Sequence, residues 1–391
     1  MLSPTGTVGA RSRGCGHAED AVSRGRSDTG KRGFRVTTTI VETVDALTPA
    51  WLTEVLAGTA VLERGGSEVV SVAAAPLGTG QMCDSYRLRL ELADGSAREL
   101  IAKLPSTDPN SRAAGLGLRA YEKEVRFYQE LVDGLAVRTP VVHHSDIDTT
   151  TGAFVLLMED MAPATQGDQL VGCSVDEARA ALSELVGVHA PRWGDPALHE
   201  LEWLKGERGP ARDMMIQMLP VLWTGFLERY DDDLTDQVRS AGAVVFARLA
   251  SFYEDREPVT VVHGDYRLDN LLFHPADGSV AVLDWQTCTI GPGPADAAYF
   301  VGAGLLPEVR RAHEAELFDH YLGGLVDAGV DVDRDSCWTA YRRGTWNGLV
   351  MAVGASMLVE RTERGDQMFM AMASRHAQHA IDLDAAQLLD A

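Results

Sequence analysis

Three short apolar runs between residues 259 and 283 constrain the fold of this chain more than any other segment. The run at 259–262 is rich in β-branched residues, and the runs at 271–273 and 279–283 are separated by the turn sequence Pro-Ala-Asp-Gly. Apolar runs bounded by turn residues are typical of short strands. We therefore predict a small β-hairpin from the second and third runs, preceded by a loop that leaves the first.

Three polar side chains occupy the ends of these runs. Asp265 and Asn270 lie in the loop, within the sequence His-Gly-Asp-Tyr-Arg-Leu-Asp-Asn, and Asp284 follows the last run. A hairpin would bring all three to one side. Asp265 is then placed to accept the proton of an attacking hydroxyl, and Asn270 and Asp284 offer the hard oxygens that Mg²⁺ prefers. This order of base, amide and metal aspartate is typical of phosphoryl transfer from a nucleotide.

In the alternative interpretation the loop is an ordinary turn and Asp284 caps the end of a strand. Three roles at the correct spacing are much rarer than one motif match, which favours the catalytic interpretation. Other polar residues nearby are given structural roles. Asp296 is interpreted as a helix N-cap or first-turn acid, and His263 and His189 as hydrogen-bonded structural histidines.

A glycine-containing turn lies upstream, between strands predicted at 68–75 and 85–92. Gly78, Thr79 and Gly80 would let the backbone approach nucleotide phosphates with its N–H groups. A plain hairpin turn explains the same residues equally well. The full Gly-x-Gly-x-x-Gly pattern is absent from the chain, and so is the Lys-containing P-loop sequence, which disfavours a P-loop nucleotidase.

Lys103 ends the next predicted strand, at 99–103, and resembles the lysine of the third strand of kinases. A lysine on an apolar strand requires a partner. The following segment, 116–132, has helical spacing and carries two candidate carboxylates, Glu122 and Glu124. We predict that Glu124 pairs with Lys103, because Glu124 lies nearer the apolar face of this helix.

A further apolar run at 154–158 predicts a buried strand that leads into Glu159-Asp160-Met161. In a two-lobed protein the segment after such a strand is suited to be the hinge between the lobes. We predict from this position that the backbone of Glu159 and Met161 binds the adenine of the nucleotide.

The order of the predicted elements favours an α+β protein with two lobes. Residues 1–35 are rich in Gly, Ser and Arg and predict a disordered tail. Residues 36–160 predict a β-rich, nucleotide-binding lobe with one main helix, and residues 161–391 a helical lobe with the catalytic loop and an acceptor pocket. The helices of this second lobe are predicted at 174–189, 211–230, 236–254, 307–328, 334–358 and 365–389.

Composition excludes several partners. The net charge of −22 argues against a nucleic-acid ligand, which requires a basic surface. No apolar run approaches the roughly 18 residues of a membrane span. Five scattered cysteines without a Cys-x-x-Cys pair are typical of a reducing compartment, and we predict a cytoplasmic protein. The oligomeric state is left open.

Through six segments the chain resembles the aminoglycoside phosphotransferase and choline-kinase-like superfamily. The resemblance is closest to the branch that includes ecdysteroid-kinase-like proteins and many actinobacterial phosphotransferases. The resemblance extends from about Leu47 to the C-terminus. Its carriers are HGDYRLDN, LDWQ, IAKLP, YEKEVRFYQEL, LLMEDM and VHAPRW. It implies a protein-kinase-like fold with a small β-rich N-lobe and a large helical C-lobe.

The resemblance also implies an activity, the Mg²⁺-dependent transfer of the γ-phosphate of ATP (or GTP) to a hydroxyl of a small molecule. Asp265 would be the catalytic base, Asn270 and Asp284 the Mg²⁺ ligands, and Lys103, oriented by Glu124, would hold the α- and β-phosphates. Trp-Gln follows Asp284 where protein kinases have Phe-Gly, and no Ala-Pro-Glu segment follows. Both departures argue against a protein acceptor.

The acceptor itself stays open at this point. An aminoglycoside requires a strongly acidic pocket, whereas a hydroxyacyl, steroid or other lipid-like acceptor requires an apolar one, and fold-level analogy does not choose between them. Aromatic candidates for this pocket are Tyr299, Trp338, Tyr341 and Trp346, although residues at helical spacing more often belong to the core. The alternative to an enzymatic function is that of a pseudokinase-type regulator, which binds a nucleotide without catalysis.

Overall fold

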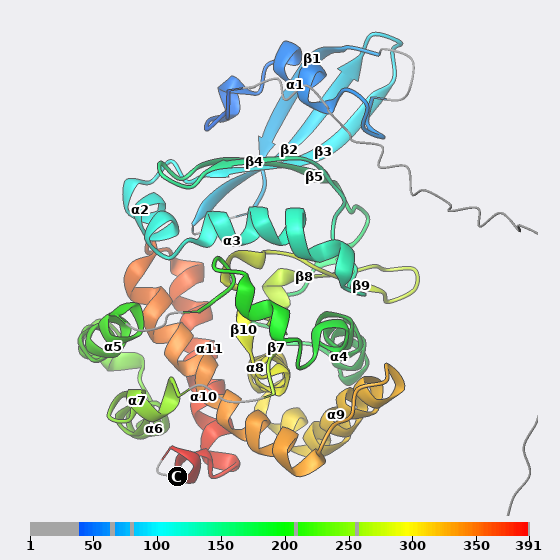
Figure 1. Cartoon of the computed structure of the whole chain (residues 1–391). Helices are drawn as coiled ribbons and strands as arrows, with labels where there is room; N and C mark the ends of the chain where they lie inside the picture. Colours follow the sequence, from blue (N-terminus) through cyan, green and yellow to red (C-terminus); the bar gives the residue numbers. More distant parts are fainter. Residues whose placement is uncertain (1–38, 63–66, 79–81, 207–209, 255–257, 390–391) are drawn as a thin grey trace, which may run out of the picture. The chain divides into compact units, whose positions relative to one another are not determined.

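A five-stranded antiparallel sheet forms the N-terminal half of the structure, in the order β1-β2-β3-β5-β4 (Figure 1). The computed structural model describes residues 39–62, 67–78, 82–206, 210–254 and 258–389, so the predicted tail at 1–35 lies outside the described residues. The strands are β1 Val69–Pro76, β2 Cys83–Leu92, β3 Ala97–Pro105, β4 Val142–Asp148 and β5 Ala153–Glu159.

Four of these strands were predicted, and β4 was not. Its sequence, Val-His-His-Ser-Asp-Ile-Asp, shows no apolar alternation, and every residue of it is half-buried. It is a strand because its backbone pairs along β5, with Ile147 opposite Phe154. Tertiary pairing therefore fixes a segment whose own composition does not predict a strand.

Short helices cover this sheet, and they correct the prediction of one main helix at 116–132. Helix α1, Pro49–Leu56, begins at the N-cap Thr48 and buries Trp51 against the sheet. Helix α2, Pro109–Gly117, starts earlier than predicted, at the N-cap Asp108. The left-handed backbone of Arg119 (φ 56°) then separates it from α3, Ala120–Arg126, and a π-helical turn follows at Phe127–Leu131.

The C-terminal half is mostly helical, and the predicted α+β arrangement is confirmed. Helix α4 opens with a capping box between Ser174 and Glu177. Two predicted helices are shorter than expected: the one at 236–254 breaks before Leu249, and the one at 365–389 ends before the left-handed Asp384. The helices are α4 Val175–His189, α5 Pro210–Arg229, α6 Asp236–Phe246, α7 Leu249–Phe252, α8 Gly293–Gly304, α9 Pro307–Asp327, α10 Arg334–Leu358 and α11 Glu363–Asp382.

Five short strands lie among these helices. The predicted hairpin is present as β8 and β9, which pair antiparallel and are joined on one edge by β6. Strand β7, which precedes the loop, pairs with β10. The strands are β6 Thr165–Gln166, β7 Thr260–Val262, β8 Leu271–Phe273, β9 Val280–Val282 and β10 Thr289–Gly291. Among the described helices, none combines the length and the apolar character needed to cross a membrane.

Helix α8 is the centre of the helical half, since all twelve of its residues are buried. A close approach to α10 makes this possible. A Cβ atom added to Gly344 of α10 would lie 2.5 Å from the Cα atom of Ala295 on α8. The contact is with backbone, which has little freedom to move aside, so only glycine allows the two helices to meet here.

We expect Gly344→Ala to lower the free energy of unfolding by about 1–3 kcal/mol, because overpacking forces the two backbones apart. Urea denaturation followed by circular dichroism measures this. The control is Gly354→Ala on the same helix, where the added Cβ would meet only Leu219, at an ordinary 3.7 Å. The control should be neutral or slightly stabilising, since alanine favours a helix. Equal effects at both positions would contradict the role of Gly344.

Candidate phosphotransfer site

The loop between β7 and β8 is connected to the end of β9 by one side-chain and one backbone hydrogen bond. The His263 side chain bonds through Nε2 to the carbonyl of Leu283 at 2.9 Å, and the N–H of Leu283 donates to the carbonyl of Asn270 at 2.9 Å. The side chain of His263 also accepts the N–H of Asp265 through Nδ1 at 3.2 Å. His263 therefore has the structural role predicted for it, and it holds the two halves of the motif together.

Asp265 and Asn270 contact each other directly. The Asn270 amide nitrogen donates to both the carbonyl oxygen and the Oδ2 atom of Asp265, at 2.8 and 3.0 Å. These two bonds fix the plane of the amide. The Asn270 side-chain oxygen is consequently turned away from Asp265, as a ligand for a cation requires.

A helix that the sequence motif does not include supports this loop. Asp296, in the first turn of α8, accepts the N–H groups of His263 and Gly264 at 2.6 and 3.1 Å. Asp296 is 2% exposed, so it satisfies two backbone donors in the protein interior. The first-turn position was predicted, but the contact with the loop was not. His189 lies behind it as a buried core histidine bonded to Tyr321, as predicted.

Lys103 joins the sheet to the hairpin. Its ammonium lies 2.7 Å from Glu124 on α3 and 3.1 Å from Oδ1 of Asp284. The pairing with Glu124 rather than Glu122 is as predicted, since Glu122 instead pairs with Arg119 and Arg126. Gln286 adds a bond from its amide nitrogen to Glu124 at 3.2 Å.

Lys103 and Asp284 stabilise each other's charge, whereas burial raises the pKa of Glu124 in spite of the Lys103 ammonium. Burial alone would lower the pKa of Lys103, but the acidic groups around it, Asp284 first, hold that pKa well above its usual value. Burial likewise opposes the ionised form of Asp284, yet the Lys103 ammonium, together with His263 and Arg267, lowers the pKa of Asp284 below its usual value. The site therefore carries a cation and an anion in contact at neutral pH.

The segment after Asp284 packs back onto α3. Asp284 has a left-handed backbone (φ 63°, ψ 70°) that turns the chain, and Trp285 then stacks on Phe127 with ring centroids 3.7 Å apart. The Trp-Gln sequence thus has two local functions here. Trp285 fills the core beside the end of α3, and Gln286 bonds to the partner of Lys103.

The remaining predicted nucleotide-binding residues are placed as follows. Gly78 has a left-handed backbone (φ 72°), whereas Thr79 and Gly80 lie outside the described residues.

Glu159, predicted to bind adenine, ends β5 opposite Leu100, on the strand that carries Lys103. Its N–H donates to the carbonyl of Val141 at 2.8 Å and is therefore already used within the protein. Met161 is buried just beyond. The adenine-binding role of both residues stays a prediction.

The donor set at the hairpin suits magnesium better than a tightly chelated metal. Within the ranges that the structure describes, no three His, Cys, Asp or Glu side chains are grouped to hold an ion. The groups that could bind an ion at the hairpin are the amide oxygen of Asn270 and the carboxylate of Asp284. Mg²⁺ is usually bound by one or two carboxylates together with water and substrate phosphates.

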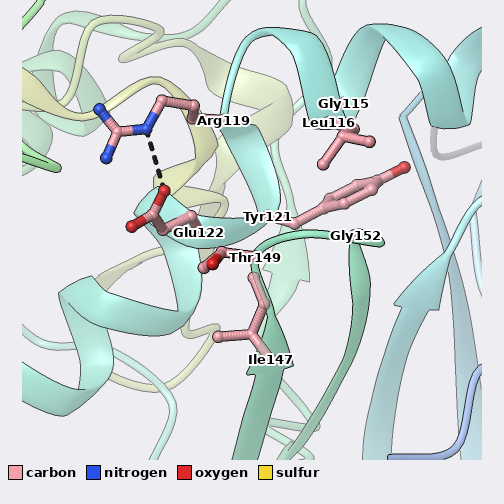
Figure 2. Close-up of a pocket in the computed structure, with 8 residues that line it drawn as sticks. All are labelled: Gly115, Leu116, Arg119, Tyr121, Glu122, Ile147, Thr149 and Gly152. Atoms are coloured by element: carbon pink, nitrogen blue, oxygen red, sulfur yellow. Dashed lines mark hydrogen bonds and ion pairs between the residues drawn. The ribbon is translucent and has the colours of Figure 1, made fainter.

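A separate small cavity lies between the α2–α3 junction and the β4–β5 turn (Figure 2). Gly115, Tyr121 and Gly152 line it, and the ion pair of Arg119 with Glu122 lies at its side. Its volume of about 20 Å³ is enough for one water molecule. It is too small for a substrate, and it is not part of the site described above.

Two of the solved structures that match this chain illustrate the fold. A Ralstonia eutropha protein assigned to the aminoglycoside phosphotransferases is 18% identical, and the match covers 87% of this chain and 98% of that one with a TM-score of 0.50. An ethanolamine kinase from Plasmodium vivax is 11% identical, with 79% and 83% covered and a TM-score of 0.50. The β-sheet N-terminal half, the helical C-terminal half and these neighbours define a protein-kinase-like two-lobed fold.

The family model for phosphotransferase enzymes (APH) matches residues 84–331, which is more than half of the chain. The chain belongs to this phosphotransferase enzyme family. It is therefore an enzyme of the small-molecule kinase class, as the resemblance implied. The narrower ecdysteroid-kinase-like assignment stays a prediction.

A curated relative matches over a much shorter stretch. Mouse acyl-CoA dehydrogenase family member 10 is 53% identical over 53 residues, which is 13% of this chain and 5% of the relative. The match therefore spans only a small part of the relative's length.

We expect Glu124→Gln to lower the free energy of unfolding by about 2 kcal/mol, because it removes one of two charges that compensate a buried ammonium. Urea denaturation measures the loss. Glu122→Gln is the control on the same helix, where the arginine partners are 45% and 36% exposed; its cost should stay below about 1 kcal/mol. An equal or larger loss of stability in Glu122→Gln would contradict the role of Glu124 as the charge partner of Lys103.

Proposed function

We propose that this protein transfers the γ-phosphate of ATP (or GTP) to a hydroxyl group of a small molecule, with Asp265 as the catalytic base. The observation that carries the proposal is the contact of Lys103 with both Glu124 and Asp284. It joins the sheet to the hairpin at the point where the phosphates of a nucleotide would lie. We further propose that residues 36–160 are the nucleotide-binding lobe and residues 161–391 the acceptor-binding lobe.

On the nucleotide side, Lys103 would hold the α- and β-phosphates while Glu124 keeps the ammonium in place. Gly78, Thr79 and Gly80 would approach the phosphates with their backbone, and Glu159 and Met161 would contact the adenine. Asn270 and Asp284 would hold Mg²⁺. When bound, this ion offsets negative charge on the phosphates.

On the acceptor side, Asp265 orients the attacking hydroxyl. The hydroxyl oxygen forms a bond to the γ-phosphorus as the bond from that phosphorus to the β–γ bridging oxygen breaks, and the hydroxyl proton passes to the Asp265 carboxylate. Most of the rate gain in such a transfer comes from positioning and from electrostatic stabilisation. A rigid loop, backed by α8, supplies the positioning.

The acceptor class is the open part of the proposal. Aminoglycoside-like alcohols and ethanolamine-like amino alcohols are the acceptors suggested by the names of the solved neighbours. Hydroxyacyl, steroid and other lipid-like alcohols, considered from the sequence, complete the set. These compounds form the test panel.

We expect purified protein, incubated with the panel and Mg-ATP or Mg-GTP, to add one phosphate to at least one alcohol, as seen by mass spectrometry. Asp265→Asn should keep nucleotide binding and reduce transfer by at least about a thousandfold, since it removes the base and its charge. Asp277→Asn, in the exposed turn between β8 and β9, is the control and should leave transfer unchanged.

The outcomes separate the rival functions. Undiminished transfer by Asp265→Asn would sink the assignment of the base. Thermal stabilisation by Mg-ATP without transfer to any alcohol would favour a pseudokinase-type regulator. No stabilisation by either nucleotide would exclude the nucleotide site altogether.

A further inference from the structure

One face of α8 holds three successive residues of the catalytic loop. Asp296 accepts the backbone N–H groups of His263 and Gly264. One helical turn further on, the Tyr299 hydroxyl donates to the Oδ1 atom of Asp265 at 2.6 Å. Residues three apart on a helix lie on the same face, so a single rigid element fixes both the backbone before Asp265 and its side chain.

The two carboxylate oxygens of Asp265 have different neighbours. Oδ2 accepts the Arg267 guanidinium N–H at 3.0 Å and the Asn270 amide at 3.0 Å. Oδ1 accepts only the Tyr299 hydroxyl among the described residues. A carboxylate has about four lone-pair sites, two on each oxygen. Both sites of Oδ2 are therefore used, and one site of Oδ1 remains for a substrate hydroxyl.

The structure assigns Tyr299 as a positioning residue for the proposed transfer: it fixes Oδ1 of Asp265 as the oxygen that accepts the acceptor hydroxyl. The inference rests on the proposed function and goes beyond it, because it selects one oxygen of the base and the residue that controls that oxygen. The hydroxyl proton passes to Oδ1 as the new bond between oxygen and phosphorus forms.

The surroundings of Tyr299 suit this role. The residue is 1% exposed, and its ring lies 5.1 Å from the ring of His376 on α11. The phenol is therefore fixed by core packing and does not line the surface of an acceptor pocket. Arg267 is fixed as well, by a second bond to Asp269 at 2.7 Å. Without Tyr299, only the Oδ2 side of the carboxylate would stay anchored, and Oδ1 would be free to rotate.

A double-mutant cycle tests whether Tyr299 acts through Asp265. Tyr299→Phe should lower kcat for transfer by about ten- to a hundredfold, the value of one hydrogen bond to a charged group, with little change in KM for the nucleotide. In an Asp265→Asn background, the same substitution should change the residual rate by less than about twofold, because the asparagine has no carboxylate left to take the hydroxyl proton.

Tyr341→Phe is the matched control. Tyr341, a pocket candidate from the sequence, belongs to the hydrophobic core and is as deeply buried as Tyr299, and its hydroxyl donates to a different carboxylate, that of Glu314, at 3.0 Å. This variant should leave kcat within about twofold of the wild type. Thermal unfolding of both tyrosine variants checks that each is folded at the assay temperature.

An unchanged kcat in Tyr299→Phe, or the same fold loss with and without Asp265, would overturn the inference while leaving the proposed function intact. If the wild type transfers phosphate to no acceptor, the proposed function fails, and crystal structures then decide on Tyr299. An Asp265 carboxylate that rotates in Tyr299→Phe supports the positioning role. A carboxylate that keeps its orientation overturns it.

Discussion

The buried ammonium of Lys103 is the interaction on which the arrangement of this site depends. A lysine side chain that is only 8% exposed loses its hydration and requires compensating charge. The two carboxylates that compensate it come from different parts of the chain, Glu124 from the helix over the sheet and Asp284 from the end of the hairpin. Satisfying one cation therefore holds the helix over the sheet and the end of the hairpin at hydrogen-bond distance from the same ammonium.

The loop itself depends on α8. Its backbone turns sharply at Gly264, where φ is 80° and an added Cβ would lie 2.7 Å from the carbonyl oxygen of Thr287. Asp296 on α8 accepts the N–H groups of this turn. The glycine at position 344 allows α10 to pack closely against α8. Packing between two helices is thus connected, through one buried carboxylate, to the orientation of Asp265.

The sequence predicted those parts of the site that are encoded locally. The hairpin, the spacing of Asp265, Asn270 and Asp284, and the choice of Glu124 over Glu122 all follow from periodicity and turn chemistry over fewer than thirty residues. The same rules missed β4, whose strand conformation comes from pairing with β5, and they missed the break between α2 and α3, which depends on Arg119 adopting a left-handed backbone.

No sequence pattern predicted the hydrogen bonds of Asp296 and Tyr299 to the loop. Both contacts span more than thirty residues, 33 from His263 to Asp296 and 34 from Asp265 to Tyr299. Tyr299 sits in an apolar helix, where its spacing marks it as core, and its ring is indeed core. Only the position of the hydroxyl, known once α8 and the loop are both placed, distinguishes it from the other buried tyrosines.

The two supports, the Lys103 contacts and the contacts of α8 with the loop, act on different parts of the site. Lys103 connects the two halves through its contacts with Glu124 and Asp284. The Asp265 loop is held by α8, through the hydrogen bonds of Asp296 and Tyr299. In the proposed function, the first support would lie on the nucleotide side, and the second would fix Oδ1 of Asp265 on the acceptor side. Phosphoryl transfer depends mainly on the alignment of the attacking and leaving oxygens with the phosphorus atom between them, and each support would position one side of that alignment.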